Sequence, residues 1–372
     1  MKQKRLKIIF SNYDDINNPY YRGGGAIALH EVAKRLSKQH EVTVITGNYP
    51  RSRNGYVGGV NYRRIGSKQS GPKAGQLIFQ FLLPFFVLKE TYDIWYEVFT
   101  PPFSTGFLPL FTKKPIVGVA SFLNAEDKSR QYGLPFYLIE NIGINTYKYF
   151  VALTSEGKKK ILQKNKKALV EIIPHGISFL PTKTRSMNKK EKYILFIGRL
   201  EIDQKGIDLL IQAYKQVSGK IRHKLLIAGD GIISDKNFIK SLITKLDLDD
   251  KIRMVGRVVD RYKNELFRNA EFIIIPSRYE TQGIVALEAI TYHKPILCFD
   301  IKGLKWLDKS MAIKVKPFLV DKFANEMLKL SQDARLQKKL SKHSKIIAKQ
   351  FNWENITLKY NRYTQSIIKT NI

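Results

Sequence analysis

One stretch of the sequence decides the fold: FIIIPSRYETQG at residues 272–283, which continues as IVALEAITYHKPILCF to residue 299. The apolar run 272–275 predicts a buried strand that ends at Pro276. A polar turn follows at 277–282, then a helix at 283–292 and a second strand at 296–299. This order is half of a Rossmann-like unit, and the turn between strand and helix is where such folds bind ligands.

Two carboxylates stand eight positions apart in this stretch, Glu280 in the turn and Glu288 in the helix. The helix is apolar all round, which predicts that Glu288 is buried and needs a cation or hydroxyl donors from a ligand. Glu280 precedes the helix, beside free backbone amides that suit an anion. The alternative is a salt-bridged Glu288 and a Glu280 that only starts the helix.

The same stretch resembles the Glu-x7-Glu signature of the retaining glycosyltransferases of family 4. The spacing is weak support by itself, but its setting is specific, with Pro276-Ser277 before it and Lys294-Pro295-Ile296 after it. The resemblance implies an α/β protein with the GT-B fold, in which two facing Rossmann-like domains hold the active site in the interdomain cleft.

Length and composition agree with such a protein. A chain of 372 residues can form two α/β domains with substantial cores. The single cysteine, Cys298, excludes an internal disulfide, suits a reducing compartment and lies in a predicted core strand. The start of the chain, residues 1–12, has a short apolar run typical of a first strand and not of a signal peptide. We therefore expect a cytoplasmic protein.

The formal charge of +32 calls for an acidic partner: nucleic acid, an anionic membrane or a phosphorylated substrate. Residues 1–180 carry a net charge of +14 and the rest +18, so the charge does not locate a site. Neither zinc-finger spacing nor an aromatic RNA-binding motif accompanies it. Nucleic acid is therefore disfavoured as a partner.

The N-terminal half begins with a strand at 7–10, a polar loop, a helix at 26–39 and a strand at 42–46. Gly23, Gly24 and Gly25 open the helix, an arrangement that suits a phosphate-binding turn. A merely flexible turn is the alternative. The arrangement resembles the family's N-terminal Gly-Gly loop, which implies donor contacts for Gly23 and Gly24.

An aromatic-rich stretch, residues 77–111, and a lysine-rich helix, residues 156–167, predict a second property of this half. The apolar run Leu77–Leu88 is too short to span a bilayer. Most of the aromatic residues suit a core, and the helix, capped by Ser155, suits solvent. The alternative is peripheral binding to the anionic inner face of the cell membrane, where a lipid-linked or saccharide acceptor would be met.

The C-terminal half opens with a second Rossmann-like unit. Its first strand, 193–197, is followed by Arg199 and Lys205 at the strand end and the helix start, where a guanidinium and an ammonium suit a diphosphate. The stretch resembles the family's Gly-Arg-Leu…Lys-Gly motif, and Arg257 and Val258 stand where the family holds the nucleobase. Asp247 and Asp249 resemble a metal-binding Asp-x-Asp pair, but they stand at a helix end before a strand and are rejected as ligands.

The resemblance extends along nearly the whole chain and divides it. It implies an acceptor-side domain over 1–180, a linker over 181–192, a nucleotide-sugar-binding domain over 193–352 and a final helix over 353–372 that crosses back to the first domain.

The implied reaction moves a sugar from a nucleotide-diphosphate donor, a UDP- or GDP-sugar, to an acceptor hydroxyl with retention at the anomeric carbon. It uses no cofactor and no obligatory metal. Glu280, Arg199 and Lys205 would be the catalytic residues, with Glu280 on a sugar hydroxyl and the two cations on the leaving diphosphate. Glu288 would hold the ribose diol, and the amides of Thr281, Gln282 and Gly283 would complete the donor site.

Two departures from the family pattern leave alternatives open. Many members carry a histidine after the strand that here ends at Ala120, but this chain has Ser121-Phe122-Leu123-Asn124. Gln282 stands where an aromatic residue is common, which bears on the choice of sugar. His175 is equally a turn residue or a ligand contact. The rival functions are a catalytically silent subunit of the same fold, a sugar-nucleotide epimerase and a nucleic-acid binder.

Overall fold

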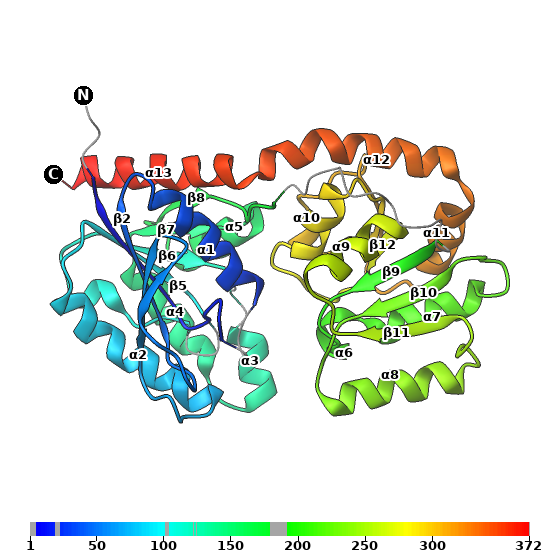
Figure 1. Ribbon diagram of the computed structural model, residues 1–372, viewed down its shortest axis with the longest axis horizontal. Helices are drawn as coiled ribbons and strands as arrows, with labels where there is room; N and C mark the ends of the chain where they lie inside the picture. Colours follow the sequence, from blue (N-terminus) through cyan, green and yellow to red (C-terminus); the bar gives the residue numbers. More distant parts are fainter. Residues whose placement is uncertain are drawn as a thin grey trace. The chain divides into compact units, whose positions relative to one another are not determined.

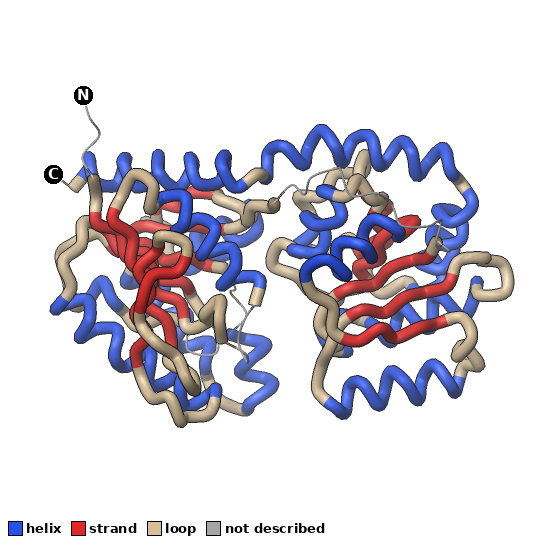
Figure 2. The backbone as a smooth tube through the Cα atoms, viewed as in Figure 1, coloured by secondary structure: helices blue, strands red, loops and turns tan. Residues whose placement is uncertain are grey.

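The computed structural model describes residues 5–18, 23–100, 104–121, 123, 125–178 and 192–371. The chain divides into two compact units (Figure 1): unit 1 is Met1–Gly176 with Trp353–Ile372, and unit 2 is Ile177–Asn352. Each unit is a sheet with helices on both faces (Figure 2). The predicted boundary at 180 and the predicted linker, apart from Lys192, lie outside the described residues.

The sheet of unit 1 has the strand order β3-β4-β2-β1-β5-β6-β7-β8, and only the β3–β4 pair is antiparallel. Its strands are β1 (Lys7–Asn12), β2 (Glu41–Gly47), β3 (Gly55–Val57), β4 (Val60–Ile65), β5 (Ile94–Val98), β6 (Ile116–Ala120), β7 (Tyr149–Ala152) and β8 (Leu169–Ile172). The inner strands are near-continuous apolar runs because a parallel sheet is buried on both faces.

Side chains that alternate along β1 separate two cores. Ile8 and Phe10 point into the core under α1 (Gly24–Leu36) and α13 (Trp353–Thr370). Ile9 points into the core on the other face. That face is covered by α2 (Pro72–Lys89), η1 (Leu108–Leu110), α4 (Phe136–Thr146) and α5 (Ser155–Lys164), and α3 (Ala125–Tyr132) packs on α4. The C-terminal helix α13 therefore completes the core of unit 1.

The sheet of unit 2 is parallel throughout, with the order β11-β10-β9-β12-β13-β14. Its strands are β9 (Tyr193–Ile197), β10 (Lys224–Ala228), β11 (Ile252–Gly256), β12 (Ala270–Ile275), β13 (Ile296–Phe299) and β14 (Ala312–Val315). Numbered within the unit the order is 3-2-1-4-5-6, that of a dinucleotide-binding Rossmann sheet. The chain changes direction across the sheet between β9 and β12, so their carboxyl ends flank the crevice where such sheets bind ligands.

The helices of unit 2 follow their strands as short crossovers. They are α6 (Ile202–Lys205), α7 (Ile207–Val217), α8 (Ile233–Lys245), α9 (Asp260–Asn269), α10 (Ile284–Thr291), η2 (Lys302–Leu304), α11 (Val320–Gln332), α12 (Ala334–Ala348) and η3 (Lys349–Phe351). The two Rossmann-like sheets confirm the predicted fold class. Cys298 lies fully buried in β13, and burial raises the pKa of its thiol to about 12.

Two local predictions are wrong, and one helix was not predicted. The lysine-rich helix is capped by Thr154, whose hydroxyl accepts a hydrogen bond from the amide of Gly157, and Ser155 is its first residue. Helix α3 was not expected, because its polar sequence has no apolar period. The first helix ends at Leu36, before the predicted end at Gln39. No helix in the described part of the chain is long and apolar enough to cross a membrane.

Candidate functional site

The turn after β12 lies against the loop after β9, because these strands are neighbours in the sheet. The two loops touch backbone to backbone at Gly206, where a Cβ atom would lie 2.2 Å from the carbonyl oxygen of Pro276. Gly206 also has a positive φ of 60°, which favours glycine. Its place between α6 and α7 therefore brings Lys205 next to the turn that holds Glu280.

Lys205 and Glu280 form an ion pair at the carboxyl ends of the strands. The Nζ of Lys205 lies 2.6 Å from Oε1 of Glu280, and the hydroxyl of Ser277 donates to the same oxygen at 2.9 Å. The two side chains are 14% and 11% exposed. Glu280 therefore faces a cation and a hydroxyl, whereas the sequence predicted helix amides as its neighbours.

Arg278 braces the turn from the other side. Its guanidinium donates to both carboxylate oxygens of Asp208, at 2.9 and 2.6 Å, and to the carbonyl of Ile202 at 2.8 Å. The backbone amide of Arg278 donates to the carbonyl of Gln204. Such a two-point contact fixes geometry as well as charge, so the loops from β9 and β12 are held as one rigid group.

Arg199 presents its charge to solvent. Its side chain is 64% exposed, with the guanidinium 3.1 Å from Oε2 of Glu201 and 3.3 Å from Oε1 of Gln204. Beneath it, Gly229 packs so closely that a Cβ there would lie 1.7 Å from the carbonyl oxygen of Gly198. The loop after β10 is thus fitted against the loop that carries Arg199.

Glu288 is half-buried and salt-bridged, so it is less buried than predicted but has a cation as its partner. Its side chain is 24% exposed, and Oε1 accepts from Nζ of Lys263, on α9, at 2.5 Å. The neighbouring helix positions, such as Leu287 and Ala289, are fully buried. Glu288 therefore points along the one side of α10 that faces α9 rather than the core, and the salt-bridged alternative describes its state.

The backbone of residues 280–283 is fixed from the side of η2. A Cβ at Gly303 would lie 1.8 Å from the carbonyl oxygen of Glu280, and the indole of Trp306 donates to the carbonyl of Gln282 at 2.6 Å. Gln282 itself is buried, and Gly283 adopts a positive φ of 73°. The turn is thereby held in a conformation that a ligand would meet preformed.

The remaining predicted residues lie on separate loops. Arg257 is exposed and Val258 half-buried, after β11, and the amide of Gly229 donates to the carbonyl of Gly256 at 2.8 Å. In unit 1, Gly23 is the N-cap of α1 and Gly24 its exposed first residue. The structure thus brings Lys205 and Glu280 into contact, and it places Arg199 and Arg257 on loops at the same end of the unit 2 sheet.

Unit 1 has a small cavity beside its glycine loop. Gly25, Ser121, His175 and Trp353 are among the residues that line it. Burial lowers the pKa of His175 to about 4, so its imidazole is neutral at pH 7. Ser121, which directly follows β6, contributes to the lining.

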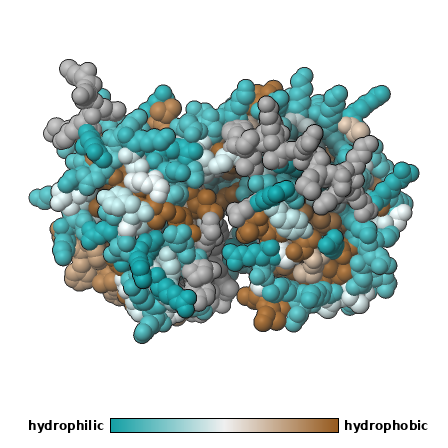
Figure 3. Space-filling model, in the orientation of Figure 1, coloured by the Kyte–Doolittle hydropathy of each residue, from teal (hydrophilic) through white to brown (hydrophobic). Residues whose placement is uncertain are grey.

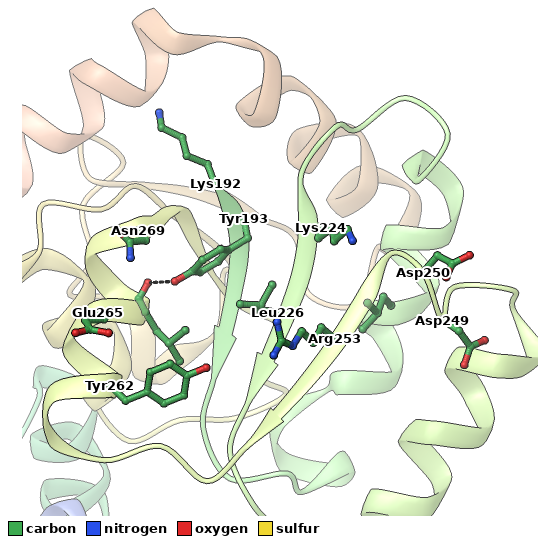
Figure 4. Close-up of a pocket in the computed structure, with 12 residues that line it drawn as sticks. Lys192, Tyr193, Lys224, Leu226, Asp249, Asp250, Arg253, Tyr262, Glu265 and Asn269 are labelled. Atoms are coloured by element: carbon green, nitrogen blue, oxygen red, sulfur yellow. Dashed lines mark hydrogen bonds between the residues drawn. The ribbon is translucent and has the colours of Figure 1, made fainter. Parts of the chain in front are cut away.

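A larger cavity, of about 530 Å³, lies at the opposite ends of the strands (Figure 4). Tyr193, Lys224 and Ile252, which line it, are the first residues of β9, β10 and β11. The hydroxyl of Tyr193 donates to the carbonyl of Leu266 there. Ligands of parallel α/β sheets bind beyond the carboxyl ends, so this cavity is not the site around Glu280.

No group of three or more His, Cys, Asp or Glu side chains within the described ranges is arranged to hold a metal ion. The partners of Glu280 are Lys205 and Ser277, and Glu288 is paired with Lys263. The site can therefore offer fixed cations, carboxylates that accept hydrogen bonds and a preformed backbone turn. These are the groups that bind a diphosphate and sugar hydroxyls.

Two family models match the chain in sequence. Residues 22–179 match the model described as Glycosyltransferase Family 4, and residues 182–346 match the model described as Glycosyl transferases group 1. The chain belongs to the group 1 glycosyltransferases. The resemblance that the Glu280 to Glu288 stretch predicted is thereby confirmed at the level of the family.

The curated relatives match this chain over only part of its length. An uncharacterized glycosyltransferase of Methanocaldococcus jannaschii is 32% identical over 169 residues, which cover 45% of this chain and 43% of that protein. The chain thus spans less than half the length of the curated relatives that it matches first.

Solved structures match over the whole chain. Sucrose-phosphate synthase from Thermosynechococcus elongatus superposes with a TM-score of 0.83 at 18% identity, covering 98% of this chain and 100% of that one. The Anabaena protein HepE in complex with UDP-glucose superposes with a TM-score of 0.75 at 16% identity, covering 97% and 100%. At these identities the likeness establishes the shared fold.

Sequence reasoning missed Ser277, Lys263 and Asp208 as partners of residues in the candidate site. Lys263 and Asp208 are far in sequence from the residues they pair with, Glu288 and Arg278. Only the position of Asp208 in the first turn of α7 gave a local signal, since acidic residues favour helix starts.

Proposed function

We propose that this protein transfers a sugar from a nucleoside-diphosphate sugar, a UDP- or GDP-sugar, to an acceptor hydroxyl with retention at the anomeric carbon. The family supports the reaction class. The complex of HepE with UDP-glucose supports a nucleotide-sugar donor for this fold. The observation that carries the proposal is the group formed by Lys205, Glu280 and Ser277 beside the exposed Arg199, at the switch point of the unit 2 sheet.

The two cations have different parts in the proposed reaction. Arg199 is exposed and can turn its planar guanidinium onto a diphosphate. Lys205 is held in place by Glu280, so its ammonium is already oriented before the donor arrives. Negative charge grows on the leaving diphosphate as the glycosidic bond breaks, and fixed cations that meet it there lower the barrier.

The carboxylates would bind hydroxyl groups of the donor. Glu280 has a second carboxylate oxygen, Oε2, for a sugar hydroxyl while Oε1 accepts from Lys205 and Ser277. Glu288 would accept from the ribose diol, with Lys263 screening its charge. The amides of Thr281 to Gly283 would complete the phosphate contacts, and Arg257 and Val258 would lie against the base. The donor phosphate would take the acceptor's proton.

Three further parts of the proposal concern unit 1 and the surroundings. Gly23 and Gly24 would contact the donor at the start of α1. The acceptor would be a lipid-linked or saccharide hydroxyl, in the assembly of a glycolipid, cell-surface polysaccharide or other glycan. The protein would work in the cytoplasm, peripherally attached to the inner face of the membrane, without a cofactor or an obligatory metal.

The test is a thermal-shift screen against UDP-, GDP- and ADP-sugars, followed by donor hydrolysis with the sugar that binds. A specific donor should raise the melting temperature by mass action, and the released sugar should keep its anomeric configuration when its proton NMR signal is read early. Arg199→Ala should lower turnover by about 100-fold. A chain that binds no nucleotide sugar would contradict the proposal.

The silent-subunit alternative makes a different prediction in the same experiment. It expects donor binding without turnover, even with a supplied acceptor. The epimerase alternative expects a changed sugar on an intact nucleotide. The contacts found at Glu280 and Glu288 are to lysines and a serine rather than to histidine, which favours transfer over proton abstraction from a sugar carbon.

A further inference from the structure

Helix α2 turns an apolar face to solvent. Leu77, Phe81, Phe85 and Leu88 follow one another at helical spacing and are 38%, 69%, 68% and 65% exposed. Their surface lies at the lower left of unit 1 in the orientation of Figure 1 (Figure 3).

The inward face of the same helix packs into the core of unit 1 and includes two polar side chains. Gln76 and Gln80 are buried, and the amide of Gln76 donates to the carbonyl of Thr100 at 2.6 Å. Phe79 and Leu83 are buried beside them. A helix in contact with water on its outer side has polar residues there, whereas α2 has large apolar residues on its outer side as well as in the core.

The exposed apolar side chains continue onto neighbouring elements of the same layer. A Cβ at Gly106, just before η1, would lie 3.2 Å from Oε1 of Gln80 on α2, and one at Gly143 on α4 would meet Thr105 and Phe107. The segment 104–111 thus lies between α2 and α4. Further exposed apolar residues of this layer are Leu110 and Phe111 beside η1, and Leu134, Tyr137, Leu138 and Ile142 at α4.

Lysines flank this apolar face. Helix α5 packs beside α4, where Nζ of Lys164 lies 2.9 Å from the buried carboxylate of Glu140. Lys158, Lys159 and Lys160 stand on α5, and Lys113 and Lys114 follow η1. Unit 1 as a whole has 29 Lys and Arg against 13 Asp and Glu, a net charge of +16.

These residues form the docking face, defined as the outer side of α2, η1, α4 and α5. Of the 22 large hydrophobic residues found exposed among the described residues, ten lie on it. On the opposite face of the sheet, α1 and α13 expose only Ile27 and Leu358 among such residues. A single large apolar area on one side of a unit marks an interaction surface.

We propose that the docking face binds a lipid bilayer with anionic headgroups, its apolar side chains entering the interface and its lysines meeting the headgroups. Aromatic and aliphatic side chains on one helix face with lysines around them are the composition of interfacial helices. The proposal assigns a surface to the peripheral attachment that is part of the proposed function, and it rests on that function for its purpose, which is to bring a lipid-linked acceptor to the enzyme.

The test is co-sedimentation of the full chain with vesicles of phosphatidylglycerol and phosphatidylcholine, and with vesicles of phosphatidylcholine alone. The wild type should bind the anionic vesicles and be released by high salt, because exposed charges are screened. Phe81→Ser with Phe85→Ser should lower the bound fraction at least tenfold. A triple variant with Lys158→Glu, Lys159→Glu and Lys160→Glu should bind the anionic vesicles more weakly, and high salt should change its bound fraction less than that of the wild type.

The matched control is Phe238→Ser with Ile346→Ser, which removes two residues that are 48% and 60% exposed on unit 2. It should bind vesicles as the wild type does. Size-exclusion chromatography of the same proteins tests a second copy of the chain as the occupant.

Two results would overturn the proposal: a wild type that stays in the supernatant with anionic vesicles, or a dimer that the Phe81 and Phe85 changes dissociate. The donor-induced thermal shift is measured on every variant without lipid. If the wild type shows no donor-induced shift, the proposed function is contradicted, but the vesicle result still tests membrane binding.

Discussion

Replacing Lys205 tests whether its pair with Glu280 both fastens the site and serves the reaction. Lys205→Met keeps an unbranched side chain but removes the cation 2.6 Å from the carboxylate. Glu280, 11% exposed, would keep only the hydroxyl of Ser277. Breaking a fully buried pair costs about 3–5 kcal/mol, and the remaining exposure of these two groups lowers our expectation to about 2–3 kcal/mol.

The expected loss is large enough to measure by melting. For a unit of this size, 1 kcal/mol shifts the melting temperature by about 2–4 °C, so Lys205→Met should melt about 4–12 °C below the wild type. The double variant with Glu280→Gln should recover most of that, because no unpaired charge remains. Lys192→Met is the control, since its pair with Glu271 has a 67% exposed lysine and should change melting by about 1 °C or less.

Turnover should separate the two roles of Lys205. The double variant should be nearly as stable as the wild type yet lose donor hydrolysis by about 100-fold or more, because the oriented cation on the leaving group is gone. A Lys205→Met protein that melts with the wild type, or a double variant that stays as unstable as the single one, would refute the structural part. Full activity in the double variant would remove Lys205 from the site.

Arg199→Ala should cut turnover by about 100-fold without changing the melting temperature, because the exposed side chain contributes charge and no packing. Steady-state kinetics check the turnover, and a melting scan checks the stability. Glu288→Ala should weaken donor binding measured by calorimetry, whereas Lys263→Ala should retain donor binding because the carboxylate is still present. If both variants instead lower only the melting temperature, and by the same amount, the pair is a structural salt bridge. Burial raises the pKa of Glu97 in the folded protein to about 7, against 4.5 for the free side chain. The contribution of Glu97 to the free energy of unfolding should therefore be greatest below pH 4.5. It should fall by about 3 kcal/mol as the pH rises through 7. Melting from pH 5 to 8 should show that fall in the wild type, and Glu97→Gln should lack it.

The fold could be predicted because parallel strands buried on both faces leave an unmistakable pattern. The run Phe272–Ile275, stopped by Pro276, and the run Ile296–Phe299 are strands within a residue or two of their predicted bounds. The helix start beside Lys205 could be predicted from the sequence. The reason for a glycine at position 206 lay in the structure, where a neighbouring carbonyl oxygen is 2.2 Å from the place of its Cβ. Local sequence carries this information because strand burial and turn conformation are local consequences of residue type.

The partners of the site residues could not be predicted, since they depend on which strands become neighbours. Glu280 meets Lys205 across 75 positions of sequence because β12 pairs with β9. The same cause explains why Glu288 is less buried than predicted. An apolar helix pattern predicts burial of the whole circumference, but α10 has one side toward α9, where Lys263 reaches the carboxylate.

Helix α2 shows the same limit in another form and explains why its outer face needs a partner. Its sequence is apolar on every side, so periodicity could not choose between a core helix and a surface one. The sheet of unit 1 can cover only one side of a helix, and that side received Phe79, Leu83 and both buried glutamines. The opposite side keeps Phe81 and Phe85, each more than two-thirds exposed. Burying such a side chain is favourable by about 1.5–3 kcal/mol. Folding of the chain leaves Phe81 and Phe85 in contact with water, so their transfer into a bilayer interface beside the lysines of α5 would gain this free energy.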